Sequence, residues 1–286
     1  MTAVDGLIIV DKPVGLTSHD VVARARRALN TRRIGHGGTL DPMATGVLVL
    51  GVGRSTRLLT YVVGTGKVYR ATIRLGQATI TDDAEGEVVS SSRTPVADEA
   101  IAADLRRMVG EIDQVPSAVS AIKIKGVRSY HRVRQGEAVE LPARRVTINS
   151  IEIGEIRRLG EVTDVDVVVD CSSGTYIRAI ARDLGTALGV GGHLTALRRT
   201  RVGQFGIEEA YTLEDLRTVP TSEALKRLMP IREVDEEQAR VVSHGGPLPP
   251  CGMPGPYGVL GPDGDALAVM SEHAGRARAE IVLVGG

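Results

Sequence analysis

One carboxylate stands in the glycine-rich stretch GHGGTLDPMATGVLVLG, which covers residues 35–51. This carboxylate, Asp41, lies between Leu40 and Pro42, and in its ionised form such a group can act as a nucleophile or a general base. Because Asp followed by Pro is a common helix start, one hypothesis is that Asp41 only caps a helix. The other hypothesis is that the glycine-rich loop displays Asp41 as a reactive group close to a ligand. Few residues separate Asp41 from the strand-like VLVLG, so any helix there is one turn at most, which favours the second hypothesis.

Other residues could complete a site with Asp41, and each also has a plain structural interpretation. Tyr69 lies on the apolar face of an alternating strand, so it could pack in the core or line the mouth of a pocket. Arg178, next to Tyr176 in the first turn of a helix, could be a solvated surface arginine. Leu197 is most simply a core leucine, and His36 a loop histidine.

Generic motifs for nucleotides and metals do not match this chain. GVGRST (51–56) lacks the third glycine of a dinucleotide fingerprint, and GTGKVY (64–69) lacks the leading glycine and the Ser/Thr of a P-loop. DPMAT (41–45) has Met43 where an aspartyl-phosphate motif has a second Asp. The six histidines show no metal-binding spacing. We therefore expect neither a cofactor nor a metal.

The composition indicates a folded protein with one large and one smaller domain. The chain has 286 residues, 42% of them hydrophobic, which is enough for a real core. Its formal net charge is zero, so overall basicity does not argue for nucleic acid, although a local basic patch remains compatible with it. The two cysteines, Cys171 and Cys251, form no metal or disulfide pattern, and no segment reaches the length of a membrane span. We expect a soluble cytoplasmic protein without a signal peptide.

The elements that must position these residues alternate between strands and helices. Apolar runs and two-residue periodicity predict strands at 6–13, 47–53, 67–76, 161–171, 257–270 (a hairpin) and 276–284, while 192–205 is a cationic strand or loop. Three- and four-residue periodicity with capping residues predicts helices at 17–30, 97–110, 172–185 (ending at Gly185), 222–230 and 235–245. We expect an α+β fold: a mixed, largely antiparallel sheet with packed helices, crossed by a cleft.

A cationic insertion at about 116–145 interrupts this order. It carries Lys123, Lys125, Arg128, Arg132, Arg134, Arg144 and Arg145, against Glu137 and Glu140. Arg and Lys can neutralise phosphates, so we expect this insertion to pack on the main body, to present a cationic face and to form a mobile flap.

Six segments of the chain, in order, resemble the TruB family of tRNA pseudouridine synthases. They are DKPVGLTSHDVV, GHGGTLDPMATGVLVLG, KVYRATIRLGQATITDDAEGE, QVPSAVSAIKIKGVRSYHRVRQG, CSSGTYIRAIARDLG and HLTALRRTRVG. The resemblance covers nearly the whole chain, and the end of the chain resembles a small PUA-like domain. It implies a pseudouridine synthase catalytic domain at 1–228, which includes the RNA-binding insertion, and a PUA-like, β-rich domain at 229–286.

The resemblance implies one reaction. The substrate is the uridine at position 55 in the T loop of tRNA, whose base is detached at N1, turned and reattached through C5. No cofactor or metal takes part, and the partner is the T arm of tRNA. We expect a monomer, since no heptad or apolar edge requires a partner.

The resemblance also assigns roles to single residues. Asp41 matches the catalytic aspartate, Tyr69 the tyrosine that stacks on the base, and Arg178 the arginine that pairs with the aspartate. We expect Tyr176, beside Arg178, to contact substrate as well. This chain differs from the family pattern in one segment, which often contains a tyrosine in the family and reads PSAVSAI here. Any contact that an aromatic side chain makes there is therefore lost.

Four further positions match residues that support the site. Leu197 matches an apolar wall of the pocket, and His36 a histidine that takes the place of the flipped base. Asp83 matches an aspartate that helps to organise the site. Lys12 matches a supporting lysine of the KP motif.

Two questions stay open at the level of sequence. Asp41 could attack ribose C1′, attack uracil C6, or take a ribose proton to start an elimination. The protein could also be a tRNA-folding chaperone in which RNA binding matters more than isomerisation, or could act on other RNAs shaped like a T arm.

Overall fold

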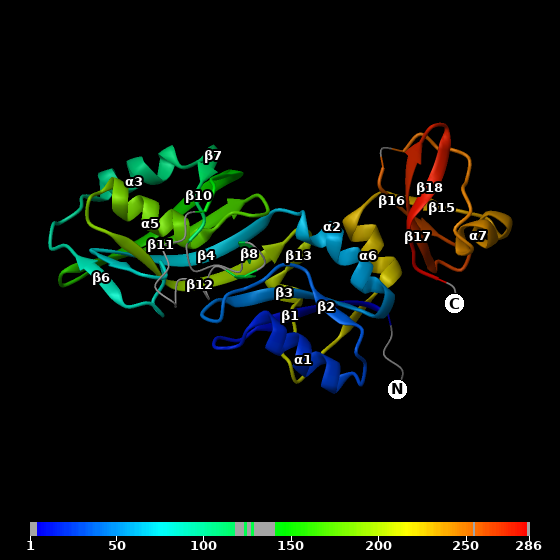
Figure 1. The fold of residues 1–286 in the computed structure, drawn as a ribbon, viewed down its shortest axis with the longest axis horizontal. Coiled ribbons are helices and arrows are strands. Elements are labelled where there is room, and N and C mark those ends of the chain that lie inside the picture. The colour runs from blue at the N-terminus through cyan, green and yellow to red at the C-terminus, as the bar shows by residue number, and fades with distance from the viewer. Residues whose placement is uncertain (1–4, 118–122, 125–126, 129–140, 254, 285–286) are drawn as a thin grey trace. The chain divides into compact units, whose positions relative to one another are not determined.

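The computed structural model describes residues 5–117, 123–124, 127–128, 141–253 and 255–284, and only the backbone of 123–124 and 127–128. The described chain forms two compact units (Figure 1). Unit 1 contains the residues up to Pro42, Gly46–Gly64 and the chain from Val202 onward. Unit 2 contains Met43–Thr45 and Thr65–Arg201.

The N-terminal strands of unit 1 pair antiparallel. β1 (Gly6–Lys12) lies between β14 (Thr218–Pro220) and β3 (Thr45–Val52), and β2 (Ile34–His36) also pairs with β3. β1 and β3 are almost wholly buried, as expected of their continuous apolar runs. These strands confirm the predictions for 6–13 and 47–53.

Helix α1 (Ser18–Ala28) follows β1. Its N-cap is Thr17, whose hydroxyl accepts from the Asp20 backbone, while the Asp20 carboxylate accepts from the Thr17 backbone. This capping box satisfies two N–H groups that the helix itself leaves unpaired. The remaining helical elements of unit 1 are η1 (Gly53–Leu58), α2 (Leu59–Val63), η2 (Ile207–Glu209), α6 (Thr221–Leu228) and α7 (Glu236–Ser243).

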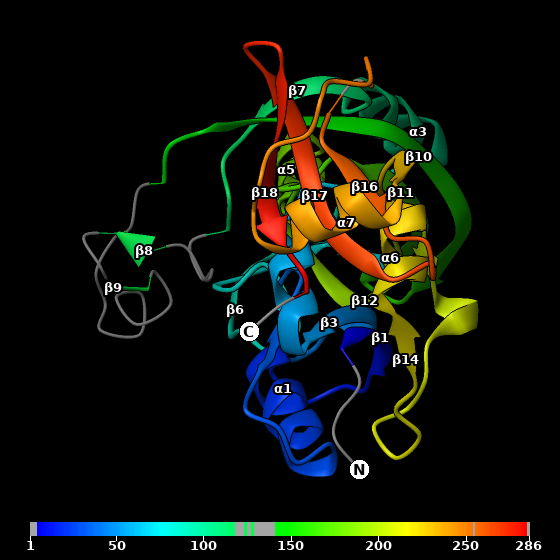
Figure 2. The same cartoon turned by 90° about the vertical axis from the view of Figure 1, so that its right-hand side faces the viewer.

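The end of unit 1 is a four-stranded sheet. β15 (Ile231–Glu233) runs parallel to β16 (Tyr257–Leu260), and β17 (Ala266–His273) and β18 (Arg276–Val282) continue antiparallel. Helix α7 packs against β17 and β18 (Figure 2). Tyr257, Val259 and Met270 belong to a buried core that consists only of residues from this part of the chain.

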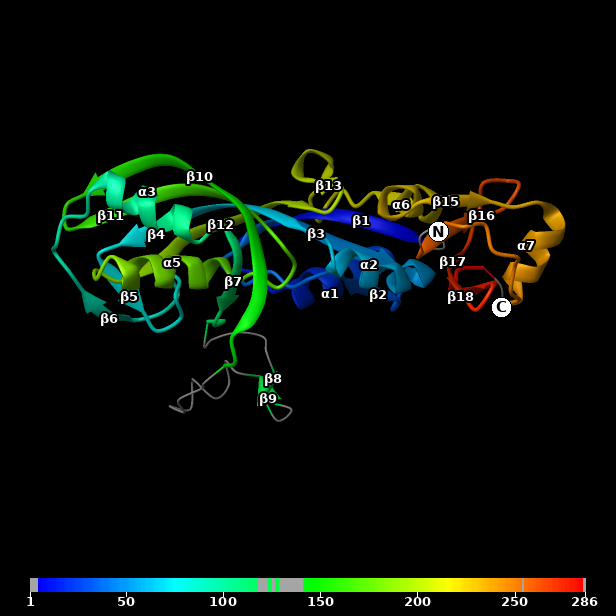
Figure 3. The ribbon, with the colours of Figure 1, turned by 90° about the horizontal axis from the view of Figure 1, so that it is seen from above.

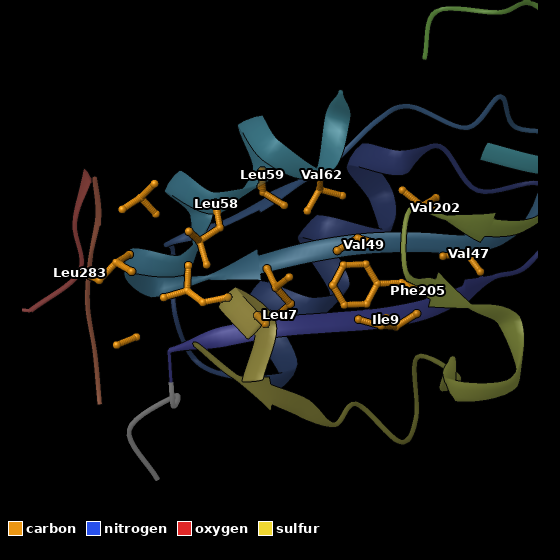
Figure 4. Close-up of a cluster of buried hydrophobic side chains, with 14 of the residues drawn as sticks. Leu7, Ile9, Val47, Val49, Leu58, Leu59, Val62, Val202, Phe205 and Leu283 are labelled. Atoms are coloured by element: carbon orange, nitrogen blue, oxygen red, sulfur yellow. The ribbon is translucent and has the colours of Figure 1, made fainter. Parts of the chain in front are cut away.

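A second core joins the two ends of unit 1. Leu7, Val49 and Phe205 pack together, and Leu283 belongs to the same cluster (Figure 4). This core contains aliphatic side chains and the single phenylalanine, in line with the low aromatic content of the chain.

Unit 2 is built on five long or medium strands. In their order of pairing they are β12 (Gly192–Val202), β4 (Lys67–Leu75), β11 (Val162–Cys171), β10 (Arg144–Leu159) and β7 (Gly110–Gln114). The strand pairs β4–β11, β11–β10 and β10–β7 are antiparallel. The alternation predicted for β4 is confirmed, since Ala71, Ile73 and Leu75 are buried and Arg70 is exposed. The fold class is therefore confirmed as mixed and largely antiparallel.

Two helices lie side by side in unit 2, α3 (Asp98–Arg107) and α5 (Ile177–Ala187), as Figures 1 and 3 show. Two short hairpins complete the unit. They are β5 (Gln77–Thr79) with β6 (Val88–Ser91), and β8 (Lys123–Ile124) with β9 (Val127–Arg128). Most of the cationic insertion lies outside the described residues.

The prediction for the helix at 172–185 is wrong at both ends. α5 begins at Ile177 and runs through Gly185 to Ala187. Gly185 does not end the helix: a Cβ there would lie 2.1 Å from the Gly192 nitrogen and 2.2 Å from the Gly191 carbonyl carbon. The glycine is thus required by a close backbone approach. The apolar stripe of the helix, which includes Ile180, Ala181 and Leu184, is buried.

Among the described residues, no helix is long and apolar enough to cross a membrane. Both cysteines are free thiols, Cys171 buried and Cys251 exposed.

Candidate active site

Asp41 lies in a turn that connects β2 to β3. Pro42 and Met43 form this turn, and β3 starts at Thr45, so the hypothesis that Asp41 begins a helix is wrong. Asp41 is half-buried. The chain reverses within a few residues because a strand follows directly, which leaves no length for helical hydrogen bonds. Asp41 is thus carried on a turn, as the display hypothesis requires.

Lys12 is fully buried and binds the backbone next to Asp41. Its Nζ donates to the carbonyl oxygens of Leu16 at 2.6 Å, Pro13 at 3.0 Å and Pro42 at 3.3 Å. The Gly15 N–H donates to the same Pro42 oxygen at 2.8 Å. These three carbonyls compensate for the burial of the ammonium and hold the residue that follows Asp41.

His36 is the last residue of β2 and faces a second histidine. Its ring meets the His19 ring edge to face, with centroids 5.3 Å apart and planes at 78°. His36 pairs with Leu50 in the register of β3, and the following Gly37 N–H donates to Val49 at 2.8 Å. The ring therefore projects from a hydrogen-bonded strand end, beside the first turn of α1.

Arg178 and Asp83 form a buried ion pair in unit 2. Arg178 is 4% exposed and Asp83 3% exposed, and the guanidinium Nη1 lies 3.1 Å from the Asp83 Oδ2. The same nitrogen donates to the Thr81 carbonyl at 2.9 Å. Arg178 is therefore not the solvated arginine of the plain interpretation.

The Asp83 carboxylate is also fixed from its own loop. Its Oδ1 accepts from the Thr81 hydroxyl at 2.5 Å and from the Glu85 N–H at 3.1 Å, while Oδ2 faces Arg178. The Asp83 carbonyl accepts from the Thr79 hydroxyl at 2.7 Å. With both oxygens occupied, Asp83 sets the direction of the Arg178 side chain.

The two apolar candidates lie on adjacent strands of unit 2. Tyr69 on β4 and Leu197 on β12 are buried, and Tyr69 stands opposite Val169 of β11. Their burial agrees with core packing and with a pocket wall, so their roles stay predictions.

Tyr176 occupies the N-cap position of α5, and its backbone is held by Gln114. The Tyr176 N–H donates to Gln114 Oε1 at 2.8 Å, and Gln114 Nε2 donates to the Tyr176 carbonyl at 3.1 Å. This pairing replaces a side-chain cap, which α5 lacks. Gln114 was not predicted as a site residue, since only the fold shows that β7 ends beside the start of α5.

A second group of charges missed in the sequence lies near the start of β4. Lys67 and Arg199 are both buried, and Lys67 Nζ donates to the Thr65 carbonyl at 2.7 Å. Burial, and after it the charge of Arg199, lowers the pKa of Lys67 to about 8. The alternating pattern of the strand places Lys67 on the same apolar face as Tyr69, and this was the signal in the sequence that could have predicted the burial of Lys67.

Within the described residues, no three or more His, Cys, Asp or Glu side chains form a group that could hold a metal ion.

Family models match most of the chain. Residues 26–177 match the N-terminal domain of the TruB family pseudouridylate synthases, and residues 178–234 match the tRNA pseudouridylate synthase B C-terminal domain. Residues 229–284 match the C-terminal region of tRNA pseudouridine synthase II.

Curated relatives are similar over nearly their whole length. The tRNA pseudouridine synthase B of Arthrobacter sp. (strain FB24) is 55% identical over 293 residues, covering 97% of this chain and 96% of that protein. The protein of the same name from Thermobifida fusca (strain YX) is 53% identical over 290 residues, covering 98% and 99%. Among solved structures, that of a Cbf5-Nop10-Gar1 complex has a TM-score of 0.73 at 26% identity and covers 98% of this chain and 85% of that chain.

Proposed function

Because the chain belongs to the TruB family of pseudouridine synthases, we propose that it converts uridine to pseudouridine at position 55 in the T loop of tRNA. The observation that carries the proposal is the 55% identity, over 97% of the chain, to a protein named tRNA pseudouridine synthase B. The fixed turn that bears Asp41 supports the chemistry, because a reactive carboxylate must be held in one direction.

Asp41 is the proposed catalytic residue. The reaction exchanges an N1 glycosidic bond for a C5 bond, and each of the three routes open to it begins with an ionised carboxylate. Asp41 attacks C1′, attacks C6 or removes a ribose proton. In every route the target nucleotide must first flip its base out of the RNA stack so that it can approach Asp41. Tyr69 and Leu197 are proposed to receive that base, because stacking on an aromatic ring is worth about 1–3 kcal/mol.

Arg178, Asp83, His36, Tyr176 and Lys12 are proposed to support this reaction. The ion pair with Asp83 fixes the Arg178 charge, which supports a role for Arg178 in holding an anionic group. The pairing of Arg178 with Asp41 that the resemblance implies stays a prediction. His36, at the end of a paired strand, is proposed to fill the gap that the flipped base leaves.

We propose that the partner is the T arm of tRNA and that the insertion at about 116–145 binds its phosphates. We further propose that the protein is a monomer and works in the cytoplasm. The phosphate-binding role of the insertion is supported only by its lysines and arginines. We also propose domains at 1–228 and 229–286, since the C-terminal sheet has a core of its own.

A full-length tRNA transcript tests the position directly. The transcript is incubated with the protein, treated with a carbodiimide that marks pseudouridine, and examined by reverse transcription. We expect a stop at position 55 and none in a transcript with cytidine there. Modification at other uridines would contradict the proposed site. Binding and refolding of the transcript without any modification would favour the chaperone alternative.

A further inference from the structure

Ser18 is a buried residue at the start of α1 whose hydroxyl does not serve the helix. Thr17 and Asp20 already form the capping box, so the cap needs no help from Ser18. Ser18 is 1% exposed. Its hydroxyl therefore binds elsewhere, and its partner is on the loop that carries Asp41.

The Ser18 hydroxyl makes two hydrogen bonds with the backbone of Leu40. Oγ accepts from the Leu40 N–H at 2.9 Å and donates to the Leu40 carbonyl at 3.2 Å. One side chain thus uses both main-chain polar groups of the residue that directly precedes Asp41. Leu40 is itself buried, so water does not readily replace these bonds.

The two neighbours of Asp41 are therefore held from the same segment of the chain. Leu40 is bound by Ser18, and the Pro42 carbonyl is bound by Lys12 and by the Gly15 N–H. Residues 12, 15 and 18 cover the end of β1, the connecting loop and the first turn of α1. The backbone on either side of Asp41 is fixed, which leaves the carboxylate little freedom beyond its own side-chain rotation.

We propose that Ser18 is a positioning residue for Asp41, an inference that rests on the proposed function. It acts through Leu40 and does not touch substrate. Catalysis depends steeply on such placement, since a displacement of about 1 Å can lower a rate about 100-fold. Loss of the Ser18 hydroxyl should then slow the chemical step and leave RNA binding in place.

The test compares Ser18→Ala with Ser55→Ala. Ser55 is also fully buried, and its hydroxyl lies 2.7 Å from the Thr221 hydroxyl in the same unit, away from the Asp41 turn. Each full-length variant is assayed for its melting temperature, for its affinity for a T-arm RNA, and for the single-turnover rate with that RNA saturated by enzyme. Hydrogen exchange of the Leu40 amide is measured in parallel.

In Ser18→Ala we expect a rate at least about tenfold lower, an RNA Kd within about twofold of wild type, and faster exchange of the Leu40 amide. Ser55→Ala should keep its rate within about twofold, whatever its melting temperature. Ser18→Cys, which keeps the volume and weakens the hydrogen bonds, gives the same readouts if the alanine variant does not fold.

Two results would overturn the inference about Ser18 but leave the proposed function intact. They are an unchanged exchange rate of the Leu40 amide in Ser18→Ala, or a single-turnover rate of Ser18→Ala equal to that of Ser55→Ala. A fall in affinity as large as the fall in rate would also overturn it, because the role would then be structural. A wild-type protein that binds the RNA without isomerising it overturns the proposed function instead.

Discussion

At the scale of single residues, the ion pair of Arg178 and Asp83 depends on its buried surroundings. Each charge has further partners: Thr81 contributes its carbonyl to Arg178 and its hydroxyl to Asp83, and Glu85 contributes an N–H. A buried pair of this kind gives little net stability, yet removal of one partner leaves an uncompensated charge.

We predict that Asp83→Ala lowers the free energy of unfolding by about 3–5 kcal/mol, because the buried Arg178 guanidinium then loses the carboxylate that it contacts at 3.1 Å. Glu161→Ala is the matched control, since Glu161 pairs with Arg93 on the surface and should cost less than about 1 kcal/mol. Urea unfolding measures both. Equal losses in the two variants would show that Asp83 does not compensate the buried charge.

Lys67 provides a prediction for pH dependence. Its pKa falls from the usual 10.5 to about 8, first because burial disfavours the charged ammonium and then because of Arg199. Between these two values the unfolded chain binds a proton that the folded chain has released. The stability contributed at Lys67 therefore rises with pH across this window, and the cost of the buried charge is complete below it.

Urea unfolding of wild type and Lys67→Met at about pH 7 and about pH 10 tests this sign. We expect the free energy of unfolding of wild type, relative to the variant, to be higher at the alkaline pH. Other titrating groups cancel in the difference because both proteins carry them. A difference that is constant with pH, or that falls, would contradict the lowered pKa.

At the scale of elements, the start of α5 is positioned by the end of β7. Gln114 holds the Tyr176 backbone through both its amide nitrogen and its amide oxygen, two residues before Arg178 in the first turn of the helix. The helix has no side-chain N-cap, so this pairing supplies the partner for an N-terminal N–H group.

We predict that Gln114→Ala lowers the free energy of unfolding by about 1–3 kcal/mol, since the part-buried Tyr176 N–H loses its hydrogen bond to the Gln114 amide oxygen. Amide exchange in the first turn of α5 should become faster. Gln204→Ala, at an exposed glutamine, should change neither quantity. The prediction fails if exchange at the start of α5 stays as slow as in wild type.

Gly185 gives a second prediction at this scale. A Cβ at this position meets the backbone of Gly191 and Gly192, whereas a Cβ at Gly64 meets nothing within 4 Å. We expect Gly185→Ala to lower the melting temperature and to cost at least about 1–3 kcal/mol. Gly64→Ala, whose φ of −71° suits any residue, should be neutral or slightly stabilising. Thermal unfolding of both variants decides the matter, and comparable stability would contradict the close approach.

The elements also show what the sequence could and could not predict. Continuous apolar runs placed β1 and β3 correctly because both faces of these strands are buried. The spacing of apolar residues placed β4 and α1 correctly because each buries one face. The C-terminal end of α5 was predicted wrongly because Gly185, interpreted as a helix stop, is instead required by the close approach of Gly191 and Gly192. Ser18 and Gln114 were missed as supports because their partners lie 22 and 62 residues away in sequence.

At the scale of the whole molecule, the two ends of the chain share one unit. Leu260 and Val269 of the C-terminal sheet, and Leu283 just after its last strand, belong to the same buried cluster as Leu7 and Leu58. Polar contacts join the same parts: Arg57 donates to the Val282 carbonyl at 2.7 Å, and the Tyr61 hydroxyl donates to Glu280 at 2.6 Å. The resemblance predicted a separate domain at 229–286, but sequence patterns carry no information about which core it joins.

We propose Asp41 as the reactive carboxylate of an RNA isomerase. The fixed backbone on either side of Asp41 matters for catalysis only if the reaction depends on the direction of the carboxylate. The exchange of an N1 bond for a C5 bond must release the hydrogen on C5. That hydrogen is therefore the direct reporter of the reaction.

The most direct measurement is tritium release from a T-arm RNA labelled at C5 of uridine, with wild type and Asp41→Asn side by side. RNA binding by both proteins is confirmed in the same samples. We predict release by wild type and none by Asp41→Asn. Release by both at similar rates would show that Asp41 does not carry out the chemistry and would contradict the central claim.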